Sequence, residues 1–264
     1  MAGLARSTFF YHQARLRAPD PQDELKAAIT RIFTGNRSRY GHRRVHLTLV
    51  AAGWRVAKKT VLKLMRQLGL RCPSRRKRRY VSYQGEIGRT APNLLERQFT
   101  ADAPNRKWVT DVTEFRVGES KLYLSPVMDL FNRQIIAHSI SRSPNMMLTH
   151  DSLRTALATL GEGETPLVHS DQGFQYQHVS WRNLLAGAGA TQSMSRKGNC
   201  YDNAVMENFF GHLKEEAFHH VRYLTLDALQ RAIEDYITWY NNDRISEKLK
   251  GLSPVQYRTQ ALAA

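Results

Sequence analysis

One stretch decides the fold of this chain: Trp108-Val109-Thr110-Asp111-Val112-Thr113-Glu114-Phe115. Its side chains are mostly β-branched or aromatic, and Gly118 follows closely, which predicts a β-strand. Asp111 lies in the middle of that strand, where a charge is costly unless a cation or a metal ion compensates it. The stretch therefore predicts a strand that carries a functional acid.

The residues on the C-terminal side of this strand follow strand and helix patterns in turn. Strands are predicted over 121–128, 134–140, 166–171 and 191–195, and helices over 146–160, 178–186 and 203–217. Pro126 implies that its strand is bulged or lies at a sheet edge. This order predicts an α/β fold, with a mixed sheet and helices packed on both of its faces.

Charge divides the chain into two parts. The 264 residues carry 39 basic and 23 acidic side chains, which gives a net charge of +16. Residues 1–107 hold 24 of the basic and 6 of the acidic side chains, and residues 108–264 hold 15 and 17. A part with net charge +18 is thus joined to a part with net charge −2. This asymmetry suggests a polyanion-binding module, and the alternative is a highly soluble surface.

The basic part has the pattern of a small all-α domain. Residues 22–34, 43–52 and 56–68 have helical spacing of their apolar side chains, and the last two helices form a helix-turn-helix candidate. The second of these helices displays Lys58, Lys59, Lys63 and Arg66, as a DNA-facing helix would. An ordinary three-helix module with a charged exposed face is the alternative.

A run of five cations follows the helices. Arg75, Arg76, Lys77, Arg78 and Arg79 repel one another and suit a flexible arm that lies along DNA phosphates. Gly and Pro residues then indicate a linker. We therefore predict a basic helical DNA-binding region over 1–80, a linker over 81–105, and a core with a C-terminal helical tail over 106–264.

Composition excludes several classes of protein. No apolar run reaches the roughly 18 residues that a membrane span needs, and the N-terminus lacks the apolar region of a secretory signal. Cys72 and Cys200 form no CxxC pair, which excludes a disulfide framework and a four-cysteine zinc site. His42 and His46 have the spacing of metal ligands on a helix, but a structural role is favoured. We expect a cytoplasmic protein.

Three carboxylates stand out by position. Asp171 ends a predicted buried strand, where sheets of this class place ligands. Glu207 lies at the rim of the buried face of its predicted helix, with Asn203 and Lys214 on the same side. Together with Asp111, these acids can hold two hard divalent cations through oxygen ligands and support phosphoryl transfer. By position alone, ordinary surface or capping acids are an equal alternative.

The chain resembles the integrase core of bacterial insertion-sequence transposases. The resemblance rests on WVTDVT at 108–113, LYLSPVMDLFNR at 122–133, HSDQGFQY at 169–176 and SMSRKGNCYDNA at 193–204. Asp171 and Glu207 are separated by 35 residues, the spacing of the DD(35)E signature shared with retroviral integrases. The likeness extends to residues 40–44, the helix-turn-helix and the closing Tyr240-Asn241.

The resemblance implies a fold, an activity and a cofactor. The fold is ribonuclease-H-like, with a mixed five-stranded sheet flanked by helices, and Asp111, Asp171 and Glu207 are the catalytic and metal-binding triad. The activity is that of a DDE transposase, which uses two Mg²⁺ ions, or Mn²⁺ as a substitute, to cleave element ends and transfer strands to a target. Lys214 matches a basic position near DNA in integrases, and Lys197 and Asn203 are further candidate DNA-binding residues.

The resemblance also implies partners. These are the element ends and target DNA, further copies of the chain assembled on DNA, and an upstream helix-turn-helix and coiled-coil segment that translational frameshifting usually joins to the core. Because no such segment precedes Met1, we expect this chain to be the second-frame product. The expected location is a bacterial cytoplasm, at the nucleoid when the protein is bound to DNA.

Three residues depart from the family pattern or need a separate reading. Glu114 stands where the family usually has an aromatic residue, and on a strand it points away from the Asp111 face, so it is not counted as a ligand. Ser246 replaces a His that is common in the tail motif. Asp129 matches the family, but its place ahead of Asn132 favours a turn residue.

Two other functions stay open at this point. The chain could be a non-catalytic DNA-binding regulator or a decayed transposase, or it could be a ribonuclease-H-type hydrolase. The intact acids and their spacing favour a transposase over a regulator. The motif at 193–204 belongs to the transposase pattern and disfavours the hydrolase.

Overall fold

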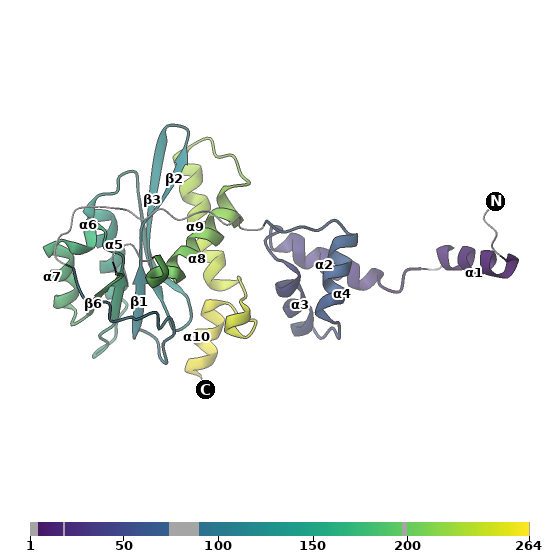
Figure 1. Ribbon diagram of the computed structural model, residues 1–264, viewed down its shortest axis with the longest axis horizontal. Coiled ribbons are helices and arrows are strands. Elements are labelled where there is room, and N and C mark those ends of the chain that lie inside the picture. The colour runs from purple at the N-terminus through teal and green to yellow at the C-terminus, as the bar shows by residue number, and fades with distance from the viewer. Residues whose placement is uncertain (1–4, 18, 74–89, 197–199, 264) are drawn as a thin grey trace. The chain divides into compact units, whose positions relative to one another are not determined.

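The computed structural model describes residues 5–17, 19–73, 90–196 and 200–263. It divides the chain into two compact units, Met1–Pro73 and Ser74–Ala264 (Figure 1). The predicted basic arm at 75–79 and the candidate Lys197 lie outside the described residues. None of the helices in the described ranges is both long enough and apolar enough to cross a bilayer.

The smaller unit is helical, as predicted. It contains α1 (Arg6–Arg17), α2 (Asp23–Gly35), α3 (His42–Ala51) and α4 (Lys58–Gln67). Its core is formed by buried side chains of α2, α3 and α4, namely Ile29, Phe33, Val45, Leu49, Val61, Leu64 and Met65. Gly53, in the turn between α3 and α4, has φ +88°, a left-handed conformation that glycine adopts without strain.

The larger unit is built on one sheet. Its strands are β1 (Lys107–Thr110), β2 (Thr113–Val117), β3 (Ser120–Asp129), β4 (Ile135–Ser141), β5 (Leu167–Ser170) and β6 (Thr191–Met194). Both β4 and the β1–β2 segment are antiparallel to β3, whereas β1, β5 and β6 are parallel to one another. The sheet is therefore mixed, as the sequence predicts.

The predicted first strand is interrupted at Asp111-Val112. Both of its halves pair with β3, because β1 pairs with residues 127–129 and β2 with residues 120–124. The Val112 N–H donates to Asp111 Oδ1 at 2.7 Å instead of continuing the ladder. Six strand segments therefore occupy the five strand positions of the prediction.

Pro126 lies on an interior strand of the sheet, because β3 pairs with β4 on one side and with β1 and β2 on the other. It pairs with His138 of β4, and the register shifts at the next two residues, Val127 and Met128. Pro126 also accepts a hydrogen bond through its carbonyl from Thr110 Oγ1 at 2.9 Å. The bulge that the sequence predicts is confirmed, and the edge position is wrong, because the irregular register accommodates a residue without an N–H.

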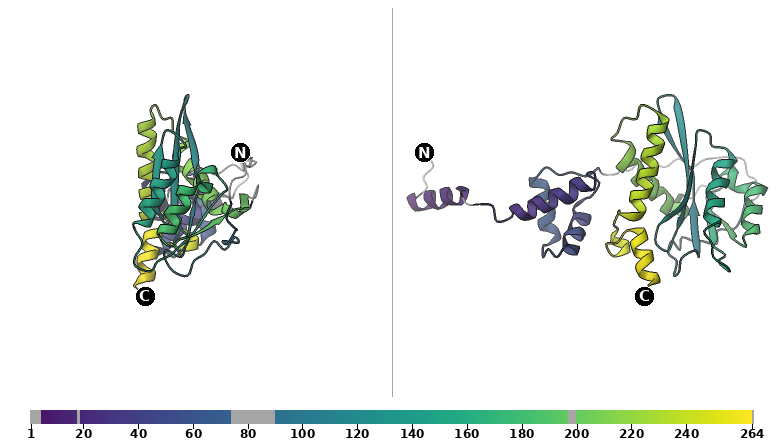
Figure 2. Two further views of the ribbon diagram at one scale, coloured as in Figure 1. Left: turned by 90° about the vertical axis from the view of Figure 1, so that its left-hand side faces the viewer. Right: turned by 180° about the vertical axis from the view of Figure 1, so that it is seen from behind.

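Helices cover both faces of the sheet (Figures 1 and 2). On one face lie α5 (Met146–Leu157), α6 (Phe174–Gln177) and α7 (Val179–Gly187), and on the other lie α8 (Ala204–Leu213), the π-helical η2 (Lys214–Phe218) and α9 (Leu226–Asn242). Side chains alternate along β1, so Trp108 packs among the first group and Val109 among the second. The chain ends with η3 (Glu247–Leu249) and α10 (Pro254–Leu262).

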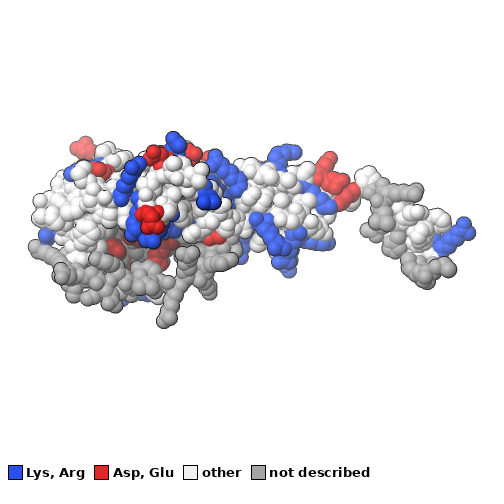
Figure 3. All heavy atoms as spheres, turned by 90° about the horizontal axis from the view of Figure 1, so that it is seen from above, with Lys and Arg blue, Asp and Glu red and all other residues white. Residues whose placement is uncertain are grey.

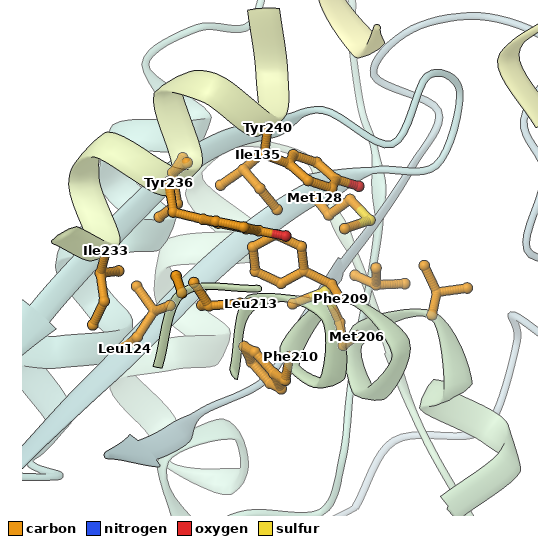
Figure 4. Packing of buried hydrophobic residues seen from close by; sticks show 14 of the residues in the cluster. Leu124, Met128, Ile135, Met206, Phe209, Phe210, Leu213, Ile233, Tyr236 and Tyr240 are labelled. Carbon is orange, nitrogen blue, oxygen red and sulfur yellow. The ribbon is translucent and has the colours of Figure 1, made fainter. Parts of the chain in front are cut away.

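Aromatic side chains join α8 to α9. Phe209 of α8 packs edge-to-face against Tyr240 of α9, with ring centroids 5.0 Å apart, and Tyr236 lies beside both rings (Figure 4). Aromatic pairs of this kind contribute roughly 0.5–1.5 kcal/mol beyond the area that they bury. They hold α8, which carries Glu207, firmly over the sheet.

Residues 90–105, which the sequence analysis assigns to a linker, belong to the larger unit. Leu95 is 1% exposed and packs in the core beneath α8 and α9. The N–H groups of Leu94 and Leu95 both donate to Ser193 Oγ, at 2.9 and 3.2 Å. The boundary of the compact units lies after Pro73, because this Pro-containing segment is ordered by contacts with residues far along the chain.

Asn241 of α9 tests how the helix is anchored to the sheet. Its side chain accepts from the Ile135 N–H and donates to the Ile135 carbonyl, both at 2.9 Å. Asn241→Ala leaves both backbone groups of this buried residue unpaired, so we expect a loss of about 1–3 kcal/mol in unfolding free energy. Asn242→Ala is the matched control, because Asn242 is exposed and bonds within its own helix. Equal urea midpoints for the two variants would contradict this anchoring role.

Candidate active site at the strand break

Asp111 and Asp171 follow the last residues of two neighbouring parallel strands. Val109 of β1 pairs with His169 of β5, and continuing this register by two residues places Asp111 beside Asp171. Because side chains alternate along a strand, Asp111 points to the same face as Val109, which is the face that α8 covers. The structure therefore brings together two of the three predicted acids.

One oxygen of each aspartate is already held by the backbone. Val112 N–H donates to Asp111 Oδ1 at 2.7 Å, and Gly173 N–H donates to Asp171 Oδ1 at 2.9 Å. In the described part of the chain, no protein donor is assigned to the second oxygen of either carboxylate. The two side chains are thus oriented by the backbone and present one oxygen each.

The surroundings raise the pKa of both aspartates. Burial raises the pKa of Asp111 well above its ordinary value, the negative charge of Asp171 raises it further, and Glu207 adds a smaller contribution. The Val112 N–H and the Lys214 charge oppose this rise. Burial also raises the pKa of Asp171, against the effect of the Gly173 N–H. The pair is an unfavourable arrangement of like charges, of the kind that a cation relieves.

Glu207 lies within electrostatic range of this pair. It is half-buried in the first turn of α8, and its charge acts on Asp111. Within the described residues, however, no three His, Cys, Asp or Glu side chains are grouped closely enough to form a complete metal-binding set. The electrostatic effect of Glu207 on Asp111 links the third predicted acid to the aspartate pair.

The structure corrects the expectation for Asn203 as a DNA-binding residue. Asn203 is 4% exposed, and its Nδ2 donates to the Thr110 carbonyl at 3.2 Å. Its Oδ1 is buried and has no hydrogen-bond partner among the described residues. A side chain enclosed in this way contacts the strand break rather than the surface, which its position on the helix could not reveal.

Lys214 lies within electrostatic range of Asp111. Its Nζ is 5.2 Å from the ring centroid of Phe115, and its charge lowers the pKa of Asp111. Lys214 is the first residue of η2, seven residues beyond Glu207, and the charges of both residues act on Asp111.

Two buried groups near the aspartates were not singled out from the sequence. His169 is fully buried, with Nδ1 2.8 Å from Ser193 Oγ and Nε2 3.1 Å from Ser195 Oγ, and burial lowers its pKa to about 4. It is therefore a neutral link between β5 and β6. Burial, together with the charges of Asp111 and Asp171, raises the pKa of Tyr176 well above its ordinary value. Ser193 and Ser195 are two residues apart, so their side chains share one face, and this spacing was a usable sequence signal for a polar contact with the neighbouring strand.

The remaining single residues have structural partners. Glu114 binds Lys121 and the Tyr123 hydroxyl, at 3.0 and 3.1 Å. Asp129 accepts from the Phe131 N–H two residues on, as a turn residue does, and is also fully buried. His46 Nε2 lies 3.0 Å from the Val56 carbonyl. Ser246 accepts from the Lys248 N–H at the start of η3.

The predicted DNA-facing side chains of α4 are all exposed; they are Lys58, Lys59, Lys63 and Arg66. The opposite side of the helix carries its buried residues, Val61, Leu64 and Met65. Figure 3 shows Lys and Arg side chains on the surface of the helical unit. The four predicted cations thus lie away from the packed side of α4.

Comparison with known proteins gives the family. Models of the integrase core domain match residues 101–200 and 207–262, and a model of an HTH-like domain matches residues 20–78. The chain is 49% identical over 259 residues to the putative transposase InsK for insertion sequence element IS150 of Escherichia coli K12, over 98% of this chain and 91% of the relative. It is 36% identical over 265 residues to the transposase InsF for insertion sequence IS3A of the same organism, over 98% and 92%.

The chain belongs to the insertion-sequence transposases. This membership makes it a DDE polynucleotidyl transferase with an integrase core, and it confirms the predicted ribonuclease-H-like fold preceded by a helix-turn-helix region. The transposase is also similar to the HTLV-2 integrase catalytic core domain solved in complex with magnesium. That likeness has 18% identity and a TM-score of 0.48, over 60% of this chain and 99% of that chain.

Asp111→Asn tests the strain of the buried acids. A carboxyl whose pKa is raised by folding holds a proton that the unfolded chain has released, so stability falls as pH rises from the ordinary Asp pKa through the raised value. In EDTA at neutral pH we therefore expect Asp111→Asn to raise Tm by about 2–4 °C, the effect of about 1 kcal/mol in a domain of this size. The gain should shrink near pH 4. If the variant melts at a lower temperature than wild type at neutral pH, the charge of Asp111 does not destabilise the folded protein.

Proposed function

We propose that this transposase cleaves DNA at the ends of its insertion sequence and joins those ends to target DNA in a reaction that depends on divalent metal ions. The observation that carries the proposal is the juxtaposition of Asp111 and Asp171, each with one oxygen held by the backbone. The location of Glu207 on the facing helix supports it. Family membership supports the class of reaction, and the juxtaposed acids support this location for it.

The donor set of the site fits a hard divalent cation. Asp111, Asp171 and Glu207 offer carboxylate oxygens, which Mg²⁺ prefers and Mn²⁺ accepts. Positive charge would also offset the repulsion that raises the pKa of Asp111. When bound, two such ions would supply activation of the attacking hydroxyl and charge stabilisation of the leaving oxygen.

Protein side chains then have distinct roles. Asp111 and Asp171 would bind the ions through the oxygens that the backbone leaves open, and Glu207 would complete the set from the first turn of α8. Lys214 places a positive charge beside Asp111, where a DNA phosphate can approach. Because Asn203 is enclosed, its role is to hold the start of α8 against Thr110 rather than to contact DNA.

The basic helical unit is proposed to supply most of the DNA affinity. Exposed cations of α4, the arm at 75–79 and Lys197 would contact phosphates of the element ends and the target. The proposal also includes assembly of several copies of the chain on DNA and cooperation with an upstream-frame product. The reaction would take place in the bacterial cytoplasm, at the nucleoid. A regulator without catalysis is the alternative.

Glu207→Gln separates the enzyme from the regulator. The substitution keeps the volume of the side chain but removes a ligand charge, so strand joining should fall by orders of magnitude while DNA binding stays near wild type. The measurement is a joining assay with precut element ends and Mn²⁺ at equal DNA occupancy, with and without the upstream segment. Glu215→Gln is the control, because Glu215 pairs with His220 at 2.9 Å outside the acid set.

Two outcomes would count against the proposal. If Glu207→Gln joins ends as well as wild type does, Glu207 is not part of the catalytic set. If wild type joins no ends even when fused to the upstream segment, the regulator is the better description.

The charged face of α4 predicts a salt effect. Replacing Lys58, Lys59, Lys63 and Arg66 together by Ala should weaken duplex binding and flatten its salt dependence. If wild type contacts about six phosphates, log K should fall with log salt at a slope near −5, and each lost contact should reduce the slope by about 0.9. Fluorescence anisotropy over a salt series measures both quantities. An unchanged slope would show that α4 does not lie on the DNA backbone.

A further inference from the structure

Asp202 is a fully buried carboxylate that accepts five hydrogen bonds. It lies in η1 (Cys200–Asn203), the short turn that leads into α8. Its donors are Asn93 Nδ2 at 3.0 Å, Arg97 Nε at 2.9 Å, and the backbone N, Nε and Nη2 of Arg196 at 3.0, 2.9 and 3.0 Å. A buried charge with this many donors is fully compensated and geometrically fixed.

The donors come from segments far apart in the sequence. Asn93 and Arg97 belong to the stretch that leads into β1, and Arg196 follows β6. The hydrogen bonds from the Arg196 side chain lower the pKa of Asp202 well below its ordinary value, so the carboxylate is ionised at physiological pH. Asp202 therefore ties the start of α8 to both segments with a permanent charge.

The residue after Asp202 carries this constraint to the acid pair. Asn203 donates to the carbonyl of Thr110, the residue that precedes Asp111 at the strand break. Glu207 lies four residues beyond Asn203, about one helical turn into α8. The segment from Asp202 to Glu207 is therefore anchored to the strand break at Asn203, the residue next to the Asp202 charge.

We propose that Asp202 is a positioning residue that sets the approach of Glu207 to Asp111 and Asp171. The inference rests on the proposed function, in which Glu207 completes the metal-binding set. Because Glu207 lies about one helical turn into α8, the placement of the start of α8 sets how closely Glu207 approaches the two aspartates. Asp202 is enclosed by its five donors, so it would act through α8 rather than by direct contact with DNA or an ion.

The chain offers a matched control in Asp129. This aspartate is also fully buried, and it accepts from the Asn105 and Phe131 N–H groups and from Arg258, at 2.9, 3.0 and 3.0 Å. It pairs with Trp108, at the opposite end of β1 from Asp111. Loss of either buried charge should destabilise the fold, but only Asp202 leads to the start of α8.

The test is a double-mutant cycle on the full chain, read by calorimetric titration with Mn²⁺ in the presence of a precut DNA end. Asp202→Asn and Glu207→Gln should each weaken Mn²⁺ binding by about 10–100-fold, the range for residues that orient metal ligands. The double variant should be no weaker than the weaker single one, because a Gln at 207 leaves Asp202 nothing to position. Asp129→Asn should lower Tm but bind Mn²⁺ as wild type does.

Arg97→Ala and Arg196→Ala provide a milder route if Asp202→Asn does not fold. Both side chains are substantially exposed, 46% and 60%, so each removes donors from Asp202 with less disturbance of the core. Each should weaken Mn²⁺ binding in the same direction, and Arg154→Ala, another partly exposed arginine paired with an aspartate, should not.

The outcomes are distinguishable. The positioning role is overturned if the losses of Mn²⁺ affinity in Asp202→Asn and Glu207→Gln multiply in the double variant. It is also overturned if Asp202→Asn and both arginine variants bind Mn²⁺ as wild type does. Either result leaves the proposed function intact. Unchanged Mn²⁺ binding in Glu207→Gln overturns the metal-binding role of Glu207 itself, and the positioning role with it.

Discussion

The rest of the larger unit is organised around two like charges placed side by side. Asp111 and Asp171 end neighbouring parallel strands on the covered face of the sheet, where burial and mutual repulsion raise the pKa of Asp111. The break between β1 and β2 gives the first carboxylate a backbone donor, and the turn at Gly173 gives one to the second. These two hydrogen bonds and the nearby Lys214 charge compensate only part of the free-energy cost of placing two carboxylates together. The site is therefore suited to positive charge.

Such a pair needs a rigid frame, because side chains under repulsion separate if the backbone allows it. One face of the sheet is packed by α5 and α7, and the other by the aromatic contacts of α8 and α9. The far end of α8 is held by Glu216 of η2, which receives two hydrogen bonds from Arg244 at 2.8 and 2.9 Å and one from Tyr236 at 2.8 Å. Buried charge networks therefore fix both ends of the helix that carries Glu207.

Sequence patterns predicted the helices, the strands and the three acids, but not the contacts between segments far apart in the sequence. Runs of β-branched and aromatic residues predicted the strands, and helical spacing predicted α2 to α4. Asp171 and Glu207 stood out by their positions on a predicted strand and helix, and their 35-residue spacing supported the resemblance to the family. The interruption at Asp111 was not predictable, because a β-branched run continues through it. The packing of residues 90–105 and the burial of Asn203 depend on partners roughly a hundred residues away, such as Asp202 and Thr110, and local composition carries no information about these partners.

The division of charge between the two parts follows from the chemistry of the acid pair. A cluster of carboxylates repels the phosphate backbone, and residues 108–264, with a net charge of −2, offer little long-range attraction to overcome this. Residues 1–107, with a net charge of +18, can supply that attraction, whereas Lys214 is a cation whose charge acts directly on Asp111. In the proposed function, this division supplies most of the DNA affinity outside the acid pair and leaves the second carboxylate oxygens for metal ions. In the proposed reaction, the distribution of charge along the chain is therefore a requirement of the site itself.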